Sequence, residues 1–379
     1  MNTTRLILGI AITLLIMCPS LYGQTKIATV EELSAINDSK TSLAGDYVLM
    51  SDLTLNNWTP IGGLDNKEGE FSGTFDGNGH TITITGFNNS SDNSRIGLFG
   101  SIEQKGVVKN LCVAGNFSYT SGWKFLYIGG VAGVNYGHII CCASKIALEG
   151  TINSGQKKQG KVQSIFGYED GTFGGCIVGI NLGVVDNCYS TGSILVSGDK
   201  FKNCAGGITG GNGVLSINPG TVKVYNSILH CYSTASVIAK GDVTYIVSGG
   251  IAALNNTNGV IMKCVSLNKI IEAHGAKRTR LFAMPVATFG YTNYRNPDVF
   301  YREDIIIRKY KNGDEQKQEK FSEKNAVVFS TTQEQSWWRY PDGLSENDKN
   351  QKFGFSFGDN EQSPWAWNNE EKHPVLYWE

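Results

Sequence analysis

The sequence lacks an excess of charge of either sign, and it contains little proline. Of its 379 residues, 33 are Lys or Arg and 34 are Asp or Glu, so the formal net charge is −1 at pH 7. A chain this close to neutrality has no overall electrostatic footprint for nucleic acid or for an anionic membrane. Only 8 prolines stand beside 46 glycines, and 41% of the residues are hydrophobic. This composition excludes a disordered chain and a collagen-like chain.

The sequence also lacks the short motifs of several common catalytic and metal sites. The histidines form no HExxH or HxH pattern, and there is no GxSxG elbow and no phosphate-binding glycine loop. The nine cysteines show none of the CxxC spacings that zinc sites use. We therefore predict a protein without cofactor or metal, and no enzyme.

A long apolar run occurs only at the N-terminus. Arg5 precedes the apolar residues 6–17, which are too few for a comfortable bilayer span, and Gly23 offers a small residue at a cleavage site. Residues 1–23 are therefore predicted to be a signal peptide, and no membrane span is expected after its removal. Cys18 raises the alternative of a lipoprotein, which the neighbouring Met17 and Pro19 disfavour.

Glycine is abundant because a glycine-rich unit recurs along the chain. The units open with G-x-[apolar]-x-G or a close variant, at Gly97, Gly129, Gly175, Gly206 and Gly249. They end at Leu111, Cys142, Cys188, Cys231 and Cys264. The first spacing between ends is 31 residues, and the next two exceed it by 15 and 12, through single insertions within 143–174 and around 211–225. Insertions tolerated at one place predict loops that leave a stack of coils.

Similar side chains recur at the same position of each unit. Three residues before each end stand Val108, Ile139, Val185, Ile228 and Ile261. Parallel strands stacked one above another would join such residues into a continuous core. Val185 and Cys188 can both face inward only if the chain bends near Asn187. We then expect Cys142, Cys188, Cys231 and Cys264 to form a ladder of small buried side chains, with a disulfide such as Cys176–Cys204 as the alternative.

These repeats resemble a known family. The segments GLFG (97–100), GGVAGVNYG (129–137), GCIVGINLGVVDNCYSTG (175–192) and HCYSTA (230–235) are similar to GLUG-motif repeats. That family occurs in exported bacterial surface proteins, including adhesin-like proteins of Bacteroidetes and the non-catalytic part of some immunoglobulin A metallopeptidases. The resemblance implies an all-β, right-handed parallel β-helix, which we assign to residues 24–300, with the repeats at about 95–268.

Both ends of such a stack need cover, because they expose unpaired strand edges. Thr29 and Glu32 form a capping box, which predicts a short helix over residues 30–37 as the N-terminal cap. The aromatic-rich residues 301–379 are predicted to be the C-terminal cap.

Function is expected where the repeat is interrupted. The candidate ligand-binding residues are Trp123, Tyr127, Tyr291, Tyr294 and Arg295. The resemblance implies an adhesin-like protein of the bacterial surface, periplasm or extracellular space that binds a glycan or an extracellular protein. Alternatively, the aromatic residues only continue strand alternation or close the stack, and the chain is a structural spacer. A further alternative is a polysaccharide lyase or glycoside hydrolase, although no column of acids forms around Asp186.

Overall fold

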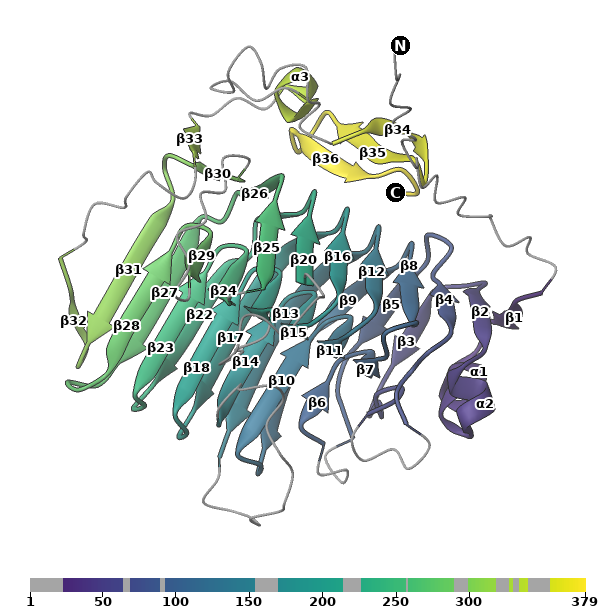
Figure 1. Ribbon diagram of the computed structural model, residues 1–379, viewed down its shortest axis with the longest axis horizontal. Helices are drawn as coiled ribbons and strands as arrows, with labels where there is room; N and C mark the ends of the chain where they lie inside the picture. Colours follow the sequence, from purple (N-terminus) through teal and green to yellow (C-terminus); the bar gives the residue numbers. More distant parts are fainter. Residues whose placement is uncertain are drawn as a thin grey trace, which may run out of the picture.

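The structure is a long stack of parallel β-strands with a small antiparallel module beside it (Figure 1). This computed structural model describes residues 23–63, 69–88, 93–153, 170–213, 226–256, 258–289, 299–317, 327–329, 334–339 and 355–379. The predicted signal peptide up to residue 22 lies outside the described residues, as do most of the first predicted insertion and the second from residue 214 onward.

The complete coils of the chain pass through four parallel sheets in the same order. The first sheet contains β1 (Thr25–Ile27), β2 (Asp46–Leu49), β4 (Thr74–Asp76), β8 (Val107–Lys109), β12 (His138–Ile140), β16 (Val184–Asp186), β20 (Asn226–Leu229) and β25 (Gly259–Met262). Neighbouring strands of this sheet come from successive coils, so residues about 31 to 46 apart in sequence lie side by side.

The second sheet is the largest and includes the longest strands. It contains β3 (Leu53–Leu55), β5 (Thr81–Ile84), β9 (Cys112–Ser121), β13 (Ala143–Ile152), β17 (Tyr189–Gly198), β21 (Tyr232–Ser233), β22 (Ser236–Gly241), β26 (Cys264–Ser266), β27 (Ile270–Gly275), β30 (Val299–Arg302), β31 (Ile306–Lys311), β32 (Asp314–Glu315) and β33 (Val327–Phe329). Only β32 pairs in the antiparallel sense.

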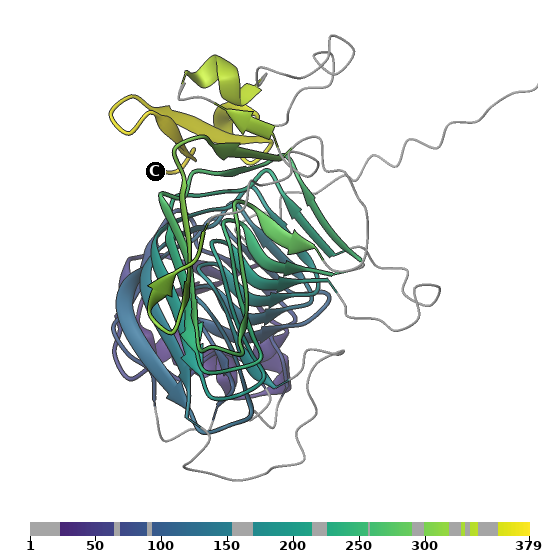
Figure 2. The same ribbon diagram turned by 90° about the vertical axis from the view of Figure 1, so that its left-hand side faces the viewer.

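The third and fourth sheets complete each coil. The third contains β6 (Arg95–Ile96), β10 (Phe125–Gly129), β14 (Gly171–Gly175), β18 (Lys202–Gly206), β23 (Tyr245–Gly249) and β28 (Arg280–Met284). The fourth contains β7 (Phe99–Ile102), β11 (Ala132–Asn135), β15 (Val178–Asn181), β19 (Thr209–Asn212), β24 (Ala252–Asn255) and β29 (Ala287–Phe289). Figure 2, turned by 90°, shows the coils one behind another.

The predicted stacking of β-branched residues is confirmed. Val108, Ile139, Val185, Ile228 and Ile261 pair in register along the first sheet, and all have 0% exposure. They face the main core cluster, in which similar side chains from every coil lie at one level. Burial of such a column stabilises the stack in proportion to the apolar area removed from water.

The predicted bend after the first sheet is also confirmed. Asn187 adopts a left-handed backbone with φ of 51°, and the equivalent residues of the other coils do the same. Those residues are Asn110, Cys141, His230 and Lys263, with φ between 47° and 55°. One left-handed residue turns the chain so that the next side chain, Cys188 in this coil, points into the core.

The four end-of-unit cysteines lie one above another in the core. Cys142 N donates to Cys188 Sγ at 3.4 Å, and each thiol of this column also donates to the carbonyl two residues before it. All eight described cysteines are free and buried. Cys176 belongs to the main core cluster and Cys204 to a separate one outside it, so no disulfide joins them.

A second ladder, of asparagines, runs along the ends of the fourth-sheet strands. Asn135 Nδ2 donates to Asn181 Oδ1 at 2.9 Å, Asn181 to Asn212 at 2.8 Å, and Asn212 to Asn255 at 2.8 Å. Each ladder residue is at most 4% exposed. The Oδ1 atoms of Asn135 and Asn181 also accept from the backbone N–H two residues on, at Gly137 and Gly183. The side-chain amides therefore supply hydrogen-bond partners for one another and for the backbone N–H groups of the corner that leads to the first sheet.

The N-terminal end of the stack carries the predicted helix. α1 (Val30–Ser34) continues into a 3₁₀ turn (Ala35–Asn37), and α2 (Lys40–Leu43) follows. The capping box of Thr29 and Glu32 is present, which confirms that prediction. Leu33, Ile36 and Leu43 are buried in the main core cluster, beside the first coil (Figure 1).

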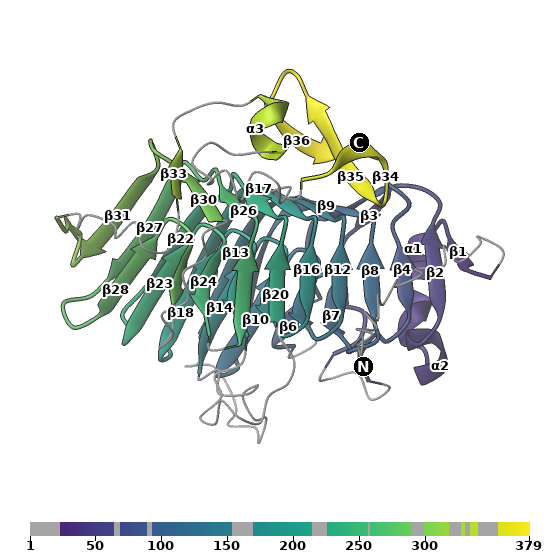
Figure 3. The same cartoon turned by 45° about the horizontal axis from the view of Figure 1, so that its top comes forward.

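The prediction that residues 301–379 cap the far end of the stack is wrong. β30, β31 and β33 continue the second sheet, so the stack extends beyond residue 300. The remaining described part is a module of α3 (Gln335–Arg339), β34 (Phe357–Asn360), β35 (Ser363–Asn368) and β36 (His373–Leu376). Figures 1 and 3 show this module beside the middle coils rather than at an end.

The module lies there because the middle coils present an outward row of aromatic side chains. Tyr189 and Tyr232 stack with their ring centroids 5.0 Å apart, on the outer face of the second sheet. Trp338 and Trp365 cover Tyr232 at 5.4 and 5.8 Å and are themselves 0% exposed. The aromatic tail thus buries a flank of the stack.

Thiol titration tests the cysteine ladder. Burial raises the pKa of the ladder thiols Cys142, Cys188 and Cys231 well above the ordinary value, and it raises those of Cys112 to about 11 and of Cys176 and Cys204 to about 12. The protein without residues 1–23 should therefore react negligibly with a thiol reagent in its native state, because the thiolate is the reactive form. After unfolding without reductant it should show eight thiols. A lower count would contradict the free-thiol ladder.

Asn181→Ala tests the asparagine ladder. The substitution removes one acceptor of Asn135 Nδ2, the donor to the buried Oδ1 of Asn212 and the acceptor of the Gly183 N–H. We expect the free energy of unfolding to fall by about 2–3 kcal/mol, the cost of unsatisfied buried polar groups. The measurement is denaturant unfolding beside the control Ser193→Ala, which alters a half-buried outer-face residue. A loss for Asn181→Ala no larger than that of the control would refute the role of the ladder.

Candidate functional site

Five polar side chains from five coils form a row on the outer face of the second sheet. These residues, called the polar row below, are Thr151, Ser197, Lys240, His274 and Tyr310. Thr151 pairs with Ser197, Lys240 with His274, and His274 with Tyr310. Ser197 and Lys240 directly follow the paired residues Val196 and Ala239. Because strands are about 4.8 Å apart, the row is about 19 Å long.

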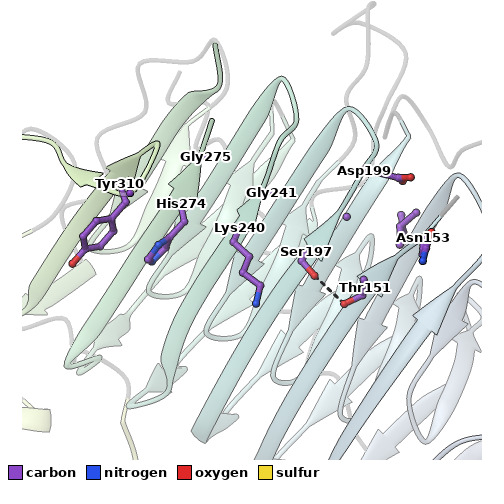
Figure 4. Close-up of a pocket in the computed structure, with 12 residues that line it drawn as sticks. Thr151, Asn153, Ser197, Asp199, Lys240, Gly241, His274, Gly275 and Tyr310 are labelled. Atoms are coloured by element: carbon purple, nitrogen blue, oxygen red, sulfur yellow. Dashed lines mark hydrogen bonds between the residues drawn. The ribbon is translucent and has the colours of Figure 1, made fainter. Parts of the chain in front are cut away.

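An open groove of about 530 Å³ follows the polar row. Figure 4 shows the five side chains placed one per strand along it. Gly198, Gly241 and Gly275 line the groove beside them. Since glycines have no side chain, they leave the groove wide enough for a ligand to approach the backbone.

The side chains of the groove are oriented by contacts with one another. Thr151 Oγ1 lies 2.8 Å from Ser197 Oγ. His274 Nε2 lies 2.8 Å from Glu272 Oε2, and the His274 ring stacks on Tyr310 with centroids 4.4 Å apart. Hydroxyl groups at one end and two stacked flat rings at the other suit a ligand that offers both hydroxyl groups and apolar faces.

The acids of the groove are not arranged for glycoside hydrolysis. Asp199 is the one carboxylate among the described lining residues. The nearby Glu272 is held by His274 and by Arg308, whose Nη1 lies 3.6 Å from it. Two carboxylates flanking a bond are the usual requirement for that reaction. In the part of the chain that the structure describes, no group of three or more His, Cys, Asp or Glu residues could hold a metal ion.

A second depression, of about 610 Å³, adjoins the groove at the turns that join the second and third sheets. Its lining includes Asp199, Phe201, Asp242 and Arg278, so it shares Asp199 with the groove. These turns are called the ridge below: residues 198–202, 240–245 and 275–280. The two hollows thus form one surface, which runs from the outer face of the second sheet over the ridge.

The predicted ligand-binding residues are not brought together. Tyr127 has 0% exposure and packs between Phe125 and Phe173, so the prediction that it contacts a ligand is wrong. It faces a separate apolar cluster on the third and fourth sheets, where burial outweighs the use of its ring as a contact. Trp123 is half-buried on the turn between β9 and β10 and lines neither hollow. Tyr291, Tyr294 and Arg295 lie outside the described residues.

Sequence reasoning missed the polar row, although a signal for it exists. Thr151, Ser197 and Lys240 each stand nine residues after the end-of-unit cysteine, and His274 stands ten after its own. Counting past the cysteines would have put these side chains at one level. Their residue types differ from coil to coil, so no recurring residue identified this position in the sequence.

The module borders the same sheet face and forms a cleft of about 590 Å³ with it. Three basic groups of this cleft are held by carboxylates. Lys145 Nζ lies 2.5 Å from Glu379, Arg302 pairs with Asp304, and His373 Nε2 lies 3.1 Å from Glu371. Of these three contacts, only Lys145–Glu379 joins the stack to the module, because Asp304 lies in the stack with Arg302 and Glu371 lies in the module with His373.

Glu361 attaches the other side of the module. It accepts from Lys109 Nζ at 2.6 Å and from Asn110 Nδ2 at 2.9 Å. Burial alone would raise the pKa of its carboxyl, but these hydrogen bonds outweigh it, and the pKa is lowered. The ionised form therefore favours the docked module.

The fold is similar to that of a solved structure, although no family model matches the chain. The similar structure is that of a "putative immunoglobulin A1 protease" from Bacteroides ovatus, with a TM-score of 0.52 and 16% identity, over 94% of this chain and 93% of that one. At this identity the likeness concerns the fold alone.

Two further proteins match short parts of the sequence. The "Putative Gly-rich membrane protein" of Evansella cellulosilytica is 42% identical over 82 residues, which are 22% of this chain and 9% of that protein. Halomucin of Haloquadratum walsbyi is 34% identical over 100 residues, which are 23% of this chain and 1% of that protein. The chain therefore spans less than a tenth of either relative. Among the described residues, no helix is long and apolar enough to cross a membrane.

The attachment of the module should weaken in acid. A carboxyl whose pKa is lowered by folding adds stability above its unfolded pKa, about 4.3 for Glu, and this stability is lost as the pH falls through the lower folded value. Between about pH 6 and about pH 3, Glu361→Gln should show a smaller acid-induced change in tryptophan fluorescence than the wild type, because Trp338 and Trp365 report docking. Glu370→Gln, at an exposed position, is the control. Identical profiles for Glu361→Gln and wild type would refute the coupling.

Proposed function

We propose that this chain is an exported, non-enzymatic, adhesin-like protein that binds a glycan along the polar row. We further propose that its stack is a right-handed parallel β-helix built from GLUG-like repeats. The observation that carries the binding proposal is the open groove with one hydrogen-bonding side chain per coil, from Thr151 to Tyr310.

The dimensions of the groove support an extended ligand. A spacing of about 4.8 Å between successive side chains is comparable with the advance per sugar in an extended oligosaccharide. Hydroxyl and amine groups can bond to sugar hydroxyls, and the stacked rings of His274 and Tyr310 offer an apolar face. A stable protein partner would need a larger contact surface, of about 800 Å² on each side.

The location of the protein is part of the proposal. The predicted signal peptide supports export from a bacterial cell to the surface, the periplasm or the medium. The name of one partial relative, a Gly-rich membrane protein, agrees with a place at the cell envelope. Tyr291, Tyr294 and Arg295, which lie outside the described residues, are proposed as additional contacts for a glycan or an extracellular protein.

A polysaccharide lyase is the second candidate, and one observation favours it. Lys240, His274 and Tyr310 occupy adjacent strands, so a cation, a base and an acid stand in one line. Elimination from a uronic acid needs these three roles: neutralisation of the carboxylate, removal of the neighbouring proton and protonation of the departing oxygen. Ultraviolet absorbance of an unsaturated sugar product would identify this activity.

A glycan array with the protein lacking residues 1–23 tests the binding proposal. We expect hits that the double variant His274→Ala/Tyr310→Ala loses by at least about tenfold in affinity, or about 1.4 kcal/mol. Trp123→Ala, at a residue outside the groove, is the folded control and should keep the hits. A blank array at high protein concentration would reject glycan binding. Loss of the hits in Trp123→Ala but not in the double variant would place the binding site at the turn that contains Trp123.

A further inference from the structure

The ridge concentrates positive charge that the composition of the whole chain conceals. Its three turns contain six basic residues, Lys200, Lys202, Lys240, Lys277, Arg278 and Arg280, and two acidic ones, Asp199 and Asp242. The whole chain, by contrast, has 33 basic and 34 acidic residues. The turns stack in successive coils, because Lys202, Tyr245 and Arg280 pair in register at their ends.

Most of this charge is not neutralised within the protein. Among the described residues, no ion pair is made by Lys200, Lys240, Lys277 or Arg278. The cleft beneath the module differs in this respect, because Lys145 and Arg302 are both held there by carboxylates. Unpaired cations that project from three adjacent turns reinforce one another and attract an anionic ligand.

Aromatic rings lie between the cations. Lys202 Nζ lies 5.3 Å from the ring centroid of Phe201 and 5.6 Å from that of Tyr245. The Arg280 guanidinium lies 5.5 Å from the Tyr245 ring, and its Nη1 donates to the Tyr245 hydroxyl at 3.0 Å. The rings hold these two cations in place.

Two of the rings are unusually exposed. Phe201 on the ridge and Phe282, two residues beyond Arg280 on β28, are each 38% exposed. They are among only five large hydrophobic side chains exposed in the described part of the chain. Exposed rings beside fixed cations match a ligand that has both apolar C–H faces and negative groups.

We infer that the ridge binds an acidic polysaccharide, one that bears uronate carboxylates or sulfate groups. This inference rests on the glycan binding proposed for the adjoining groove, and it names the class of glycan. Each of the three turns carries at least one cation, and the turns follow one another at steps of about 4.8 Å, so the cations can meet negative groups that recur along a sugar chain. The polar row beside the ridge receives the hydroxyl groups of the same chain.

The two acids of the ridge favour a sugar over a nucleic acid. Asp199 and Asp242 both line the depression. Their carboxylates accept hydrogen bonds from sugar hydroxyls, whereas they repel a continuous row of phosphates. Thr151 and Ser197 add neutral hydroxyl groups where the chain continues into the groove.

Titration calorimetry with the protein lacking residues 1–23 tests this inference. The probes are an oligogalacturonate, a chondroitin sulfate oligosaccharide, an uncharged xylo-oligosaccharide and single-stranded DNA. We expect one or both acidic sugars to bind more tightly than the uncharged sugar and the DNA, with an affinity that falls as salt is added. Comparison of the two acidic sugars shows whether carboxylate alone suffices or sulfate is needed.

Substitutions locate the binding. The double variant Lys277→Gln/Arg278→Gln should lower the affinity for the acidic sugars at least tenfold. It should leave any affinity for the uncharged sugar unchanged. The matched control, Lys26→Gln/Lys40→Gln, removes two exposed cations at the N-terminal end of the stack. Equal loss in both double variants would reject the ridge as the site.

The outcomes separate this inference from the proposed function. Preference for the uncharged sugar overturns the acidic class and leaves glycan binding standing. Absence of binding to any sugar in this set and on the array overturns both. DNA that binds as tightly as the acidic sugars, and competes with them, overturns the assignment to a carbohydrate and indicates a general polyanion site.

Discussion

The structure depends on the register between coils, which the buried asparagine ladder holds. Each amide from Asn135 to Asn255 bonds to the next, so a coil cannot slide along its neighbour without leaving several buried polar groups unpaired. A slip of one residue would also exchange the inner and outer faces of every strand. The hydrogen-bonded corner therefore decides which side chains form the core and which meet the solvent.

The candidate site follows from that register. Thr151 and Tyr310 are 159 residues apart in sequence, yet they stand in one row because each coil returns to the same level. No segment of the chain contains the site by itself. The repeat fixes the spacing between neighbouring side chains of the row. The residue type differs from coil to coil, so the row combines different functional groups at regular distances.

Regular features could be predicted from the sequence, and exceptional ones could not. The bend at Asn187 and the column around Val185 follow from counting, since one geometry must repeat in every coil. The sequence Asp76-Gly77-Asn78-Gly79, of a type that also forms hairpin turns, is a corner here, because it joins β4 and β5, which belong to different sheets. Tyr127 was misjudged because an outward ring becomes buried when neighbouring coils add Phe125 and Phe173 beside it. The module could not be placed, since its docking depends on surfaces distant in sequence.

The position of the module changes how the stack should come apart. Its contacts extend from Lys109 in an early coil to Phe300 in a late one. In a simple repeat array each coil touches only its neighbours, so the ends can fray while the middle persists. Because the module contacts several coils at once, these coils should unfold together. Tension along the axis would then be shared by the coils between Lys109 and Phe300 instead of opening them one at a time.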